Sequence, residues 1–323
     1  MSRAEYVWLQ FGQKVPILPS NQSPLGARPH RFRQTRTLIV GCGDVGLRVL
    51  PHLRSRVLVL TSSPARAPGL RALGATPLVG NLDNPRSLRR LAGLAHQVLH
   101  LAPPPTTPPS LAHDPRTRAL VQAVRRRTPP TAWVYGSTTG VYGDLKGDVA
   151  TETVAANASN TRAKRRLDAE NQQRLLGRAA GVRVIILRIP GIYALNREGG
   201  TPRERLQKGT PVLCAQDDVY TNHIHADDLA RACLAALYRG KRQRIYNVND
   251  DTVLKMGDYF DTAAAILGLP APPRIPRAQA QEQLGEMMLS FMSESRRMSN
   301  ARMKRELRLA LRYATVVEGL RTG

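Results

Sequence analysis

The segment that most constrains the fold is a glycine-rich turn after a short apolar run near residue 40. The run "TLIV" leads into Gly41, Cys42, Gly43, Asp44, Val45 and Gly46, which follow the spacing G-x-G-x-x-G. Such a turn joins a buried strand to a helix, with Gly41 making the tight bend and Gly46 allowing close packing. Gly43 lets the backbone approach a pyrophosphate, and the helix N-terminus offers N–H donors to it. The turn predicts a dinucleotide-binding site.

Strand and helix patterns then alternate along the chain. Apolar strand patterns in "RVLVLTS", "TPLVGNL", "QVLHLAPPP", "TAWVYGS" and "VRVIILRIPGIY" are separated by segments with helical periodicity. One of these helices is expected to follow Asn84 as its cap, and a long one covers residues 160–179. This alternation predicts βαβ units, and therefore an α/β fold with a Rossmann-like doubly wound parallel sheet.

The same patterns divide the chain into three parts. Residues 1–36 hold four prolines and show no periodicity, so a flexible basic extension is expected there. A dinucleotide-binding domain is expected over 37–190, completed by 222–250. A smaller C-terminal substrate subdomain is expected from 191–221 and 251–323, closing over the nicotinamide end of the site.

The second strand indicates which dinucleotide is bound. Ser62 lies 21 residues beyond Gly41, close to where NAD-binding proteins carry an acid for the ribose 2′-hydroxyl. No Asp or Glu occurs between residues 44 and 83, and the strand leads instead into hydroxyl residues and Arg66. Hydroxyls and a guanidinium suit a 2′-phosphate, so NADP is favoured, with NAD as the alternative. Arg66 as an ordinary surface arginine is the structural alternative.

The charge of the chain is strongly positive. There are 48 basic and 24 acidic residues, a net charge of +24, and 41 of the basic residues are arginine. The arginines are spread along the whole chain and aromatic residues make up only 5%, which leaves little to stack on bases. Specific nucleic-acid binding is therefore disfavoured, and weak attraction to polyanions at low salt is expected.

Composition also bears on location and on metal binding. No apolar run approaches the roughly 18 residues of a membrane-spanning helix, and the first residues lack a secretory signal pattern. Cys42, Cys214 and Cys233 are too few and too scattered for a disulfide framework or a zinc site. A cytoplasmic location, no membrane association and no metal are expected.

Seven motifs together resemble the extended short-chain dehydrogenases/reductases of the NAD(P)-dependent epimerase/dehydratase family. They are "GCGDVG", "GNLDN", "HLAPPP", "YGSTTGVYGD", "LRIPGIYALNR", "NHIHADDLARA" and "IYNVNDD", and the resemblance spans residues 37–320. The chain is also similar to bacterial sugar-nucleotide-epimerase-like proteins. The resemblance implies further cofactor contacts, from Asn81 and Leu82 at the adenine, from Ala102 and Pro103 beside the nicotinamide ribose, and from Pro190.

The resemblance implies a catalytic set that lacks one member. Thr138 falls at the family's catalytic Ser/Thr, and Lys164 at the lysine that holds the nicotinamide ribose. Asn160 occupies the place of the catalytic tyrosine, and an amide cannot exchange a proton at useful pH. Losing a general acid/base costs on the order of 10²–10⁴ in rate. Tyr193 is a possible replacement, with core packing as the alternative, and Tyr142 is expected to pack beneath the site.

Structural alternatives remain for these residues as well. Thr138 could be a strand-end cap, and Lys164 could belong to a solvated basic face. His223 and His225 are expected to be structural rather than a metal pair, and the two aspartates that follow are expected to cap a helix. The tail "NARMKRELRLALR" is expected to be the last packed helix.

Two functions stay open. The first is an NADP-dependent oxidoreductase or epimerase-like enzyme, acting on a small molecule such as a nucleotide sugar or a similar polar substrate. The second is a catalytically impaired NADP(H)-binding sensor or scaffold, which the asparagine at position 160 favours. The resemblance also implies a possible homodimer through a helix bundle that includes residues 160–179.

Overall fold

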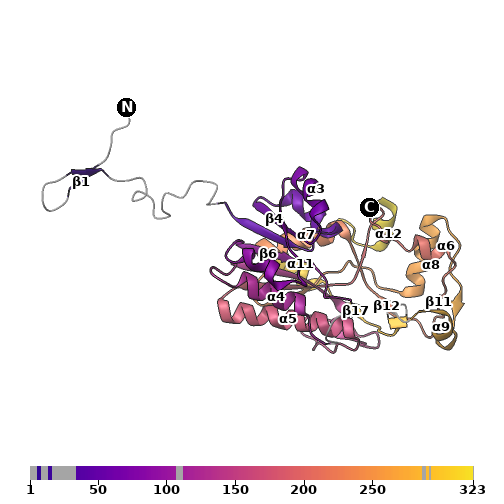
Figure 1. The fold of residues 1–323 in the computed structure, drawn as a ribbon. Helices are drawn as coiled ribbons and strands as arrows, with labels where there is room; N and C mark the ends of the chain where they lie inside the picture. The colour runs from indigo at the N-terminus through magenta and orange to yellow at the C-terminus, as the bar shows by residue number, and fades with distance from the viewer. Residues whose placement is uncertain are drawn as a thin grey trace. The chain divides into compact units, whose positions relative to one another are not determined.

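A computed structural model describes residues 6–8, 14–16, 34–106, 112–285, 289–290 and 292–322 (Figure 1). The chain forms two compact units, Met1–Thr35 and Arg36–Gly323, and the larger one carries the site. In the smaller unit, β1 (Tyr6–Trp8) pairs with β2 (Lys14–Pro16) in antiparallel fashion.

Seven parallel strands form the central sheet of the described part of the larger unit. Their order is β14-β9-β7-β6-β3-β4-β5, which is a doubly wound order because the chain reverses direction across the sheet after β5. The strands are β3 (Arg36–Val40), β4 (Arg56–Thr61), β5 (Thr76–Val79), β6 (Gln97–His100), β7 (Ala132–Thr138), β9 (Arg183–Ile189) and β14 (Arg244–Asn247).

Alternate residues of these strands enter two different hydrophobic cores. Ile39, Val59 and Leu99 belong to one core, while their neighbours Leu38 and Leu58 belong to the other. Successive side chains of a strand point to opposite faces, so a strand that is apolar throughout needs helices on both sides. This is why the strands read as continuous apolar runs.

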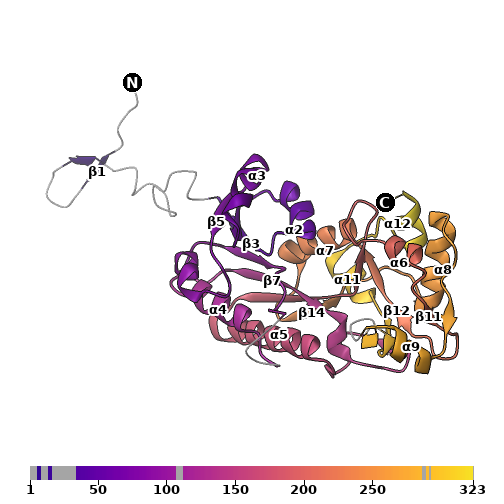
Figure 2. The ribbon, with the colours of Figure 1, turned by 45° about the vertical axis from the view of Figure 1, so that its right-hand side comes forward.

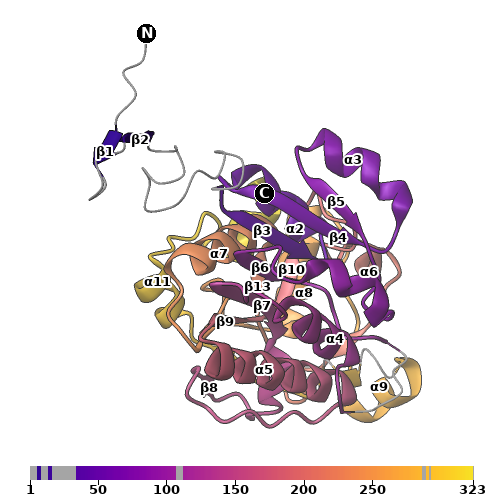
Figure 3. The ribbon, with the colours of Figure 1, turned by 60° about the vertical axis from the view of Figure 1, so that its left-hand side comes forward.

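The helices divide between the two faces accordingly (Figure 3). One face is covered by α4 (Pro115–Val124), α5 (Thr161–Ala180) and the 3₁₀ helix η4 (Pro85–Leu91). The other is covered by α2 (Asp44–Val49), α3 (Ala67–Ala72), α7 (Ala226–Arg239) and α11 (Ala301–Leu307). The predicted Rossmann-like sheet with helices on both faces is confirmed.

A separate hydrophobic core holds the C-terminal elements together (Figure 2). Its members come from β10 (Gly191–Tyr193), α6 (Arg203–Gln207), β11 (Val212–Leu213), α8 (Met256–Leu267), β16 (Arg274–Ile275), α9 (Arg277–Gln283) and α12 (Val316–Thr322). Three further short strand pairs occur in the larger unit: β12 (Tyr220–Thr221) with β15 (Leu254–Lys255), β10 with β13 (His223–His225), and β8 (Val149–Ala150) with β17 (Arg297–Met298).

The tail departs from the expected single helix. Helix α11 ends at Leu307, where Arg308 takes a left-handed conformation with φ of 52°, and α12 is the last helix of the described residues. Met303 and Leu307 lie in the core of the central sheet, so this part of the expected substrate subdomain packs on the dinucleotide domain. Beyond the helix, the buried Asp228 carboxylate accepts the backbone N–H groups of Arg312 and Tyr313 and so holds the tail in a non-helical path.

The segment after Asn84 also differs from the expected α-helix. Asn84 does cap it, since Oδ1 accepts the Arg86 N–H at 3.2 Å, but the segment is a 3₁₀ helix. Leu88 and Leu91 are fully buried three residues apart, which suits three residues per turn.

Candidate functional site

The glycine turn joins β3 to α2 at the carboxyl edge of the sheet. Gly41 has φ of +82°, and a Cβ there would lie 2.3 Å from the Ala102 backbone nitrogen. At Gly46 a Cβ would press on Cys42, with Sγ at 3.2 Å. At Gly43 a Cβ would meet no protein atom within 4 Å, so the chain leaves open space over the turn. This is the cradle that a pyrophosphate would need.

A first cavity, here called the turn cavity, lies beside Cys42 and has a volume of about 430 Å³. Its lining includes the predicted cofactor residues Cys42, Ser62, Arg66, Asn81, Leu82, Ala102 and Pro103. The Arg66 guanidinium donates to the Cys42 carbonyl oxygen at 2.7 Å, which holds it at the cavity. None of the described residues that line this cavity is an Asp or Glu.

A second cavity of about 300 Å³, the central cavity, continues from the first and shares Gly41, Gly43 and Leu101 with it. Its lining includes Asp44, Val45, Gly46, Thr138 and Pro190, all predicted site residues. The Thr138 hydroxyl also accepts the Gly140 N–H at 3.3 Å. Thr138 therefore caps the strand end and lines the cavity at once.

Helix α5 presents different residues to the cavities from those predicted. Lys164 is exposed and does not line any of the cavities described for the larger unit, so its place beside the cofactor stays a prediction. Arg166 lines the central cavity instead, and its guanidinium donates to the Gly136 carbonyl at 2.7 Å and the Tyr135 hydroxyl at 3.2 Å. Arg162, four residues earlier, lines the next cavity. Arg162 and Arg166 are thus four residues apart, the spacing that the family's catalytic tyrosine and lysine would have.

Asn160 is the cap of this helix. Its Oδ1 accepts the Ala163 N–H at 2.9 Å, and its Nδ2 donates to Glu294 at 3.2 Å. An asparagine in extended backbone before the first helical residue is a favourable N-cap. The residue therefore stabilises the start of α5 and holds the Glu294 carboxylate.

Tyr193 is not at the site. It is 2% exposed, and its hydroxyl donates to the Thr315 carbonyl at 3.1 Å. Its ring lies against His223 and His225 and covers Gly319 of α12, where a Cβ would collide with it. The alternative of core packing is correct, because the aromatic ring fills the C-terminal core rather than a cavity. Burial raises the pKa of the Tyr193 phenol well above its ordinary value.

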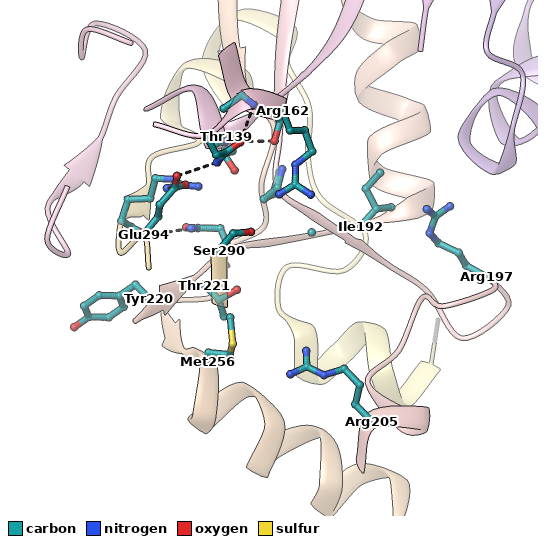
Figure 4. A pocket seen from close by; sticks show the side chains of 18 residues that line it. Thr139, Arg162, Ile192, Arg197, Arg205, Tyr220, Thr221, Met256, Ser290 and Glu294 are labelled. Atoms are coloured by element: carbon teal, nitrogen blue, oxygen red, sulfur yellow. Dashed lines mark hydrogen bonds and ion pairs between the residues drawn. The ribbon is translucent and has the colours of Figure 1, made fainter. Parts of the chain in front are cut away.

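A third cavity of about 390 Å³, the outer cavity, shares Thr138, Pro190, Ile192 and Arg197 with the central one (Figure 4). Four arginines line it: Arg162, Arg197, Arg205 and Arg296. Glu294 is the one carboxylate among the described lining residues, and it accepts from Ser159 at 2.6 Å and from Arg296 at 2.8 Å. The cavity is thus strongly positive.

A buried ion pair fixes the strand ends behind Thr138. Glu170 of α5 accepts from Arg188 of β9 at 2.8 Å and from the Ser137 hydroxyl of β7 at 2.5 Å. Both charged side chains are at most 4% exposed. The Arg188 guanidinium also lies 4.5 Å from the ring centre of Tyr142, which is fully buried beneath the site as expected.

The His and Asp residues of "HIHADD" are structural. His225 caps α7, since its Nδ1 accepts the Asp227 N–H at 3.2 Å. The expected capping by the two aspartates is wrong: Asp227 pairs with Arg48 at 2.5 Å, and Asp228 binds backbone amides of the tail. In the part of the chain that the structure describes, no cluster of His, Cys, Asp or Glu could hold a metal.

Sequence reasoning missed the arginines at the cavities. Arg166 falls on the face of α5 that carries the buried residues Ala163 and Glu170, at spacings of three and four, whereas Lys164 lies off that face. The spacing of Arg166 from these buried residues is the sequence signal that could have identified it as a cavity residue. Arg205 and Arg296 carried no such signal, because arginines occur throughout the chain.

Comparison with known proteins agrees with this geometry. The model of the NAD dependent epimerase/dehydratase family matches residues 38–249. No curated protein matches. Among solved structures, a functionally unknown conserved protein from Silicibacter pomeroyi is 28% identical, with a TM-score of 0.71 over 89% of this chain and 97% of that one.

Two other solved structures share the fold. The UDP-glucose 4-epimerase of Thermotoga maritima, solved with UDP-glucose, is 17% identical, with a TM-score of 0.70 over 89% of this chain and 96% of that one. The UDP-glucose 4-epimerase of Thermus thermophilus, in complex with NAD, is 20% identical, with a TM-score of 0.69 over 89% of this chain and 97% of that one.

Proposed function

The chain belongs to the NAD dependent epimerase/dehydratase family, and from this premise we propose that it binds NADP(H) and acts as an oxidoreductase or epimerase-like enzyme. Its substrate would be a nucleotide sugar or a similar polar molecule. The observation that carries the proposal is the row of three cavities, which leads from Arg66 past Gly43 to Thr138 and into the outer cavity.

The residues present fit a dinucleotide. Open space over Gly43 and the left-handed Gly41 suit a pyrophosphate, and Asn81 and Leu82 would flank the adenine. Ser62 and Arg66, with no acid among the described residues that line the turn cavity, favour NADP(H) over NAD(H). The related structures that contain NAD leave NAD as the alternative.

The chain's own groups would orient the substrate. The bound cofactor supplies or accepts a hydride at its nicotinamide end. Thr138, shared by the central and outer cavities, would hydrogen-bond the substrate oxygen there. Arg166 would stand in for the family's lysine beside the nicotinamide ribose. A guanidinium stays protonated, so neither Arg162 nor Arg166 can act as the acid, and the proton would pass to or from water or the substrate.

The second function, a sensor or scaffold that binds NADP(H) without turnover, is favoured by three observations at the expected catalytic positions. Lys164 is exposed and Tyr193 is buried in the C-terminal core, while an arginine pair faces the cavities. These features would remove the usual proton chemistry, whereas the open space over Gly43 still suits a dinucleotide.

The wider expectations remain proposals. Among the described residues no helix is long and apolar enough to cross a bilayer. A cytoplasmic location and a homodimer through α5 are kept as predictions, and specific nucleic-acid binding is not proposed.

The test is a titration with NADPH and with NADH, followed by nicotinamide fluorescence at about 150 mM salt, where surface charges are screened beyond roughly 8 Å. Arg66→Ala should weaken NADPH binding far more than NADH binding. Arg71→Ala is the matched control, because Arg71 is exposed on α3 and does not line the turn cavity. Failure of both nucleotides to bind would contradict the proposal.

Turnover then separates the two functions. Wild-type protein loaded with NADP⁺ is incubated with UDP-glucose and other nucleotide sugars, and Thr138→Ala is compared with it. An enzyme should lose turnover in Thr138→Ala with NADPH binding retained. A sensor should bind NADPH and turn over none of the sugars.

A further inference from the structure

One arginine of the outer cavity combines two buried nitrogens that lack a hydrogen-bond partner with the absence of an ion pair among the described residues. Arg205 lies on α6, and both its Nε and one terminal nitrogen are buried without a hydrogen-bond partner. Its guanidinium is stacked 4.2 Å from the ring centre of Phe260 on α8. The ring fixes the plane of the guanidinium but accepts no conventional hydrogen bond.

Two other arginines of the cavity are compensated. Arg197 pairs with Asp44 at 2.7 Å, and Arg296 pairs with Glu294 at 2.8 Å. Arg205 forms no ion pair within the described residues. Burial accordingly lowers the pKa of Arg205 from its usual value.

An unpaired, partly buried guanidinium is unfavourable in the free protein. Taking a charge out of water is costly unless an opposite charge and hydrogen bonds replace the water. A packing role alone would be served better by an apolar side chain of the same length. An anionic ligand group in the cavity would supply the missing charge and accept from the free nitrogens, and arginine binds carboxylates and phosphates with two parallel bonds.

The place of Arg205 in the cavity indicates which part of a substrate it would meet. Figure 4 shows Arg205 and Thr139 at opposite ends of the cavity, and Met256 lies between Thr221 and Arg205 in this view. A group held by Arg205 would therefore be remote from the substrate oxygen at Thr138, which adjoins Thr139.

Resting on the proposed function, we propose that Arg205 is a specificity-determining residue that binds an anionic group of the substrate, away from the reacting carbon. The group is a phosphate of a nucleotide or the carboxylate of a sugar acid, since both offer the same paired oxygens. The substrate is thus anionic at the end that enters the C-terminal core region, and neutral sugars are excluded.

The experiment is calorimetric titration of the full chain at about 150 mM salt with UDP, with glucuronate and with uridine. UDP carries phosphate, glucuronate carries a carboxylate, and uridine lacks both. We expect wild-type protein to bind UDP or glucuronate and not uridine, and Arg205→Met to weaken that binding at least tenfold. Arg203→Met is the control, because Arg203 is exposed on the same helix.

A thermal measurement separates a ligand role from a packing role. Methionine keeps the length and the contact with Phe260 but removes the charge, so ligand-free Arg205→Met should melt at the wild-type temperature or above. Binding of both anions unchanged in Arg205→Met, binding of neither by wild-type protein, or a lower melting temperature for Arg205→Met alone would each overturn the proposal.

The test of anion binding by Arg205 is independent of the cofactor proposal. NADPH binding is measured on the same variants and should be equal in wild type, Arg203→Met and Arg205→Met, because α6 lines neither the turn cavity nor the central cavity. If wild-type protein does not bind NADPH, the cofactor proposal is refuted, and the anion titration can still be interpreted.

Discussion

Two alanine substitutions in the glycine turn should separate stability from cofactor binding: Gly41→Ala should destabilise the fold, and Gly43→Ala should weaken cofactor binding with little change in stability. In Gly41→Ala the new Cβ would lie 2.3 Å from the Ala102 nitrogen, in backbone with φ of +82°. In Gly43→Ala it would meet no protein atom within 4 Å, in backbone with φ of −85° that any residue adopts. Only the first change strains the folded protein.

The magnitudes follow from these geometries. The left-handed backbone costs a non-glycine residue about 1–2 kcal/mol, and overpacking against backbone costs about 1–3 kcal/mol more. Gly41→Ala should therefore lose about 2–5 kcal/mol from a typical stability of about 5–15 kcal/mol. Gly43→Ala should change stability by no more than about 0.5 kcal/mol. It should nevertheless weaken NADPH binding at least about tenfold, or 1.4 kcal/mol, because its methyl occupies the space for the pyrophosphate.

The assays are urea unfolding followed by circular dichroism, and NADPH titration by nicotinamide fluorescence. Gly69→Ala is the control, since Gly69 is exposed on α3 with open space around it. This control should be stabilised by up to about 1 kcal/mol and bind NADPH normally. Wild-type NADPH affinity in Gly43→Ala would refute the assignment of the turn to the pyrophosphate, and wild-type stability in Gly41→Ala would refute the steric argument.

Three further predictions concern the groups around the site. Glu170→Gln should lower stability by about 3–5 kcal/mol in urea unfolding, because it leaves the buried Arg188 without its counter-charge; a loss below about 1 kcal/mol would contradict this. The hydrogen-bonded Arg244 guanidinium lowers the pKa of Glu306 to about 2, below its ordinary value of 4.5. The stabilisation by ionised Glu306 should be complete above pH 4.5 and vanish as the pH falls toward 2. The melting temperature of Glu306→Gln should therefore change less with pH than that of wild type over that window. Tyr193→Phe should retain full turnover in the nucleotide-sugar assay, whereas a hundredfold loss would restore this residue as the acid.

The fold was predictable because strand periodicity and the glycine turn are local features. Apolar runs such as "VRVIILRI" predict strands that are buried on both faces. The turn at the left-handed Gly41 can be predicted from its neighbours in the sequence alone. The glycine turn, Ser62 and Arg66 could be singled out because they follow the ends of predicted strands, and the carboxyl ends of parallel strands meet at one edge. The other expected cofactor contacts came from the family resemblance. These parts of the site depend on backbone direction, which sequence pattern encodes.

The orientation of individual side chains was decided only by the tertiary structure. Lys164 and Arg166 are two residues apart on one helix. Glu170 of the same helix is bonded to β7 and β9, and in this orientation of the helix Arg166 lines the cavity and Lys164 is exposed. Tyr193 alternates with its neighbours along β10, and the small Gly319 of the last helix made room for its ring in the core. Arg205 reaches the cavity through a helix whose position depends on the C-terminal core. The sequence by itself determined the sheet and the glycine turn through local periodicity, whereas contacts between distant segments decided which charges line the outer cavity.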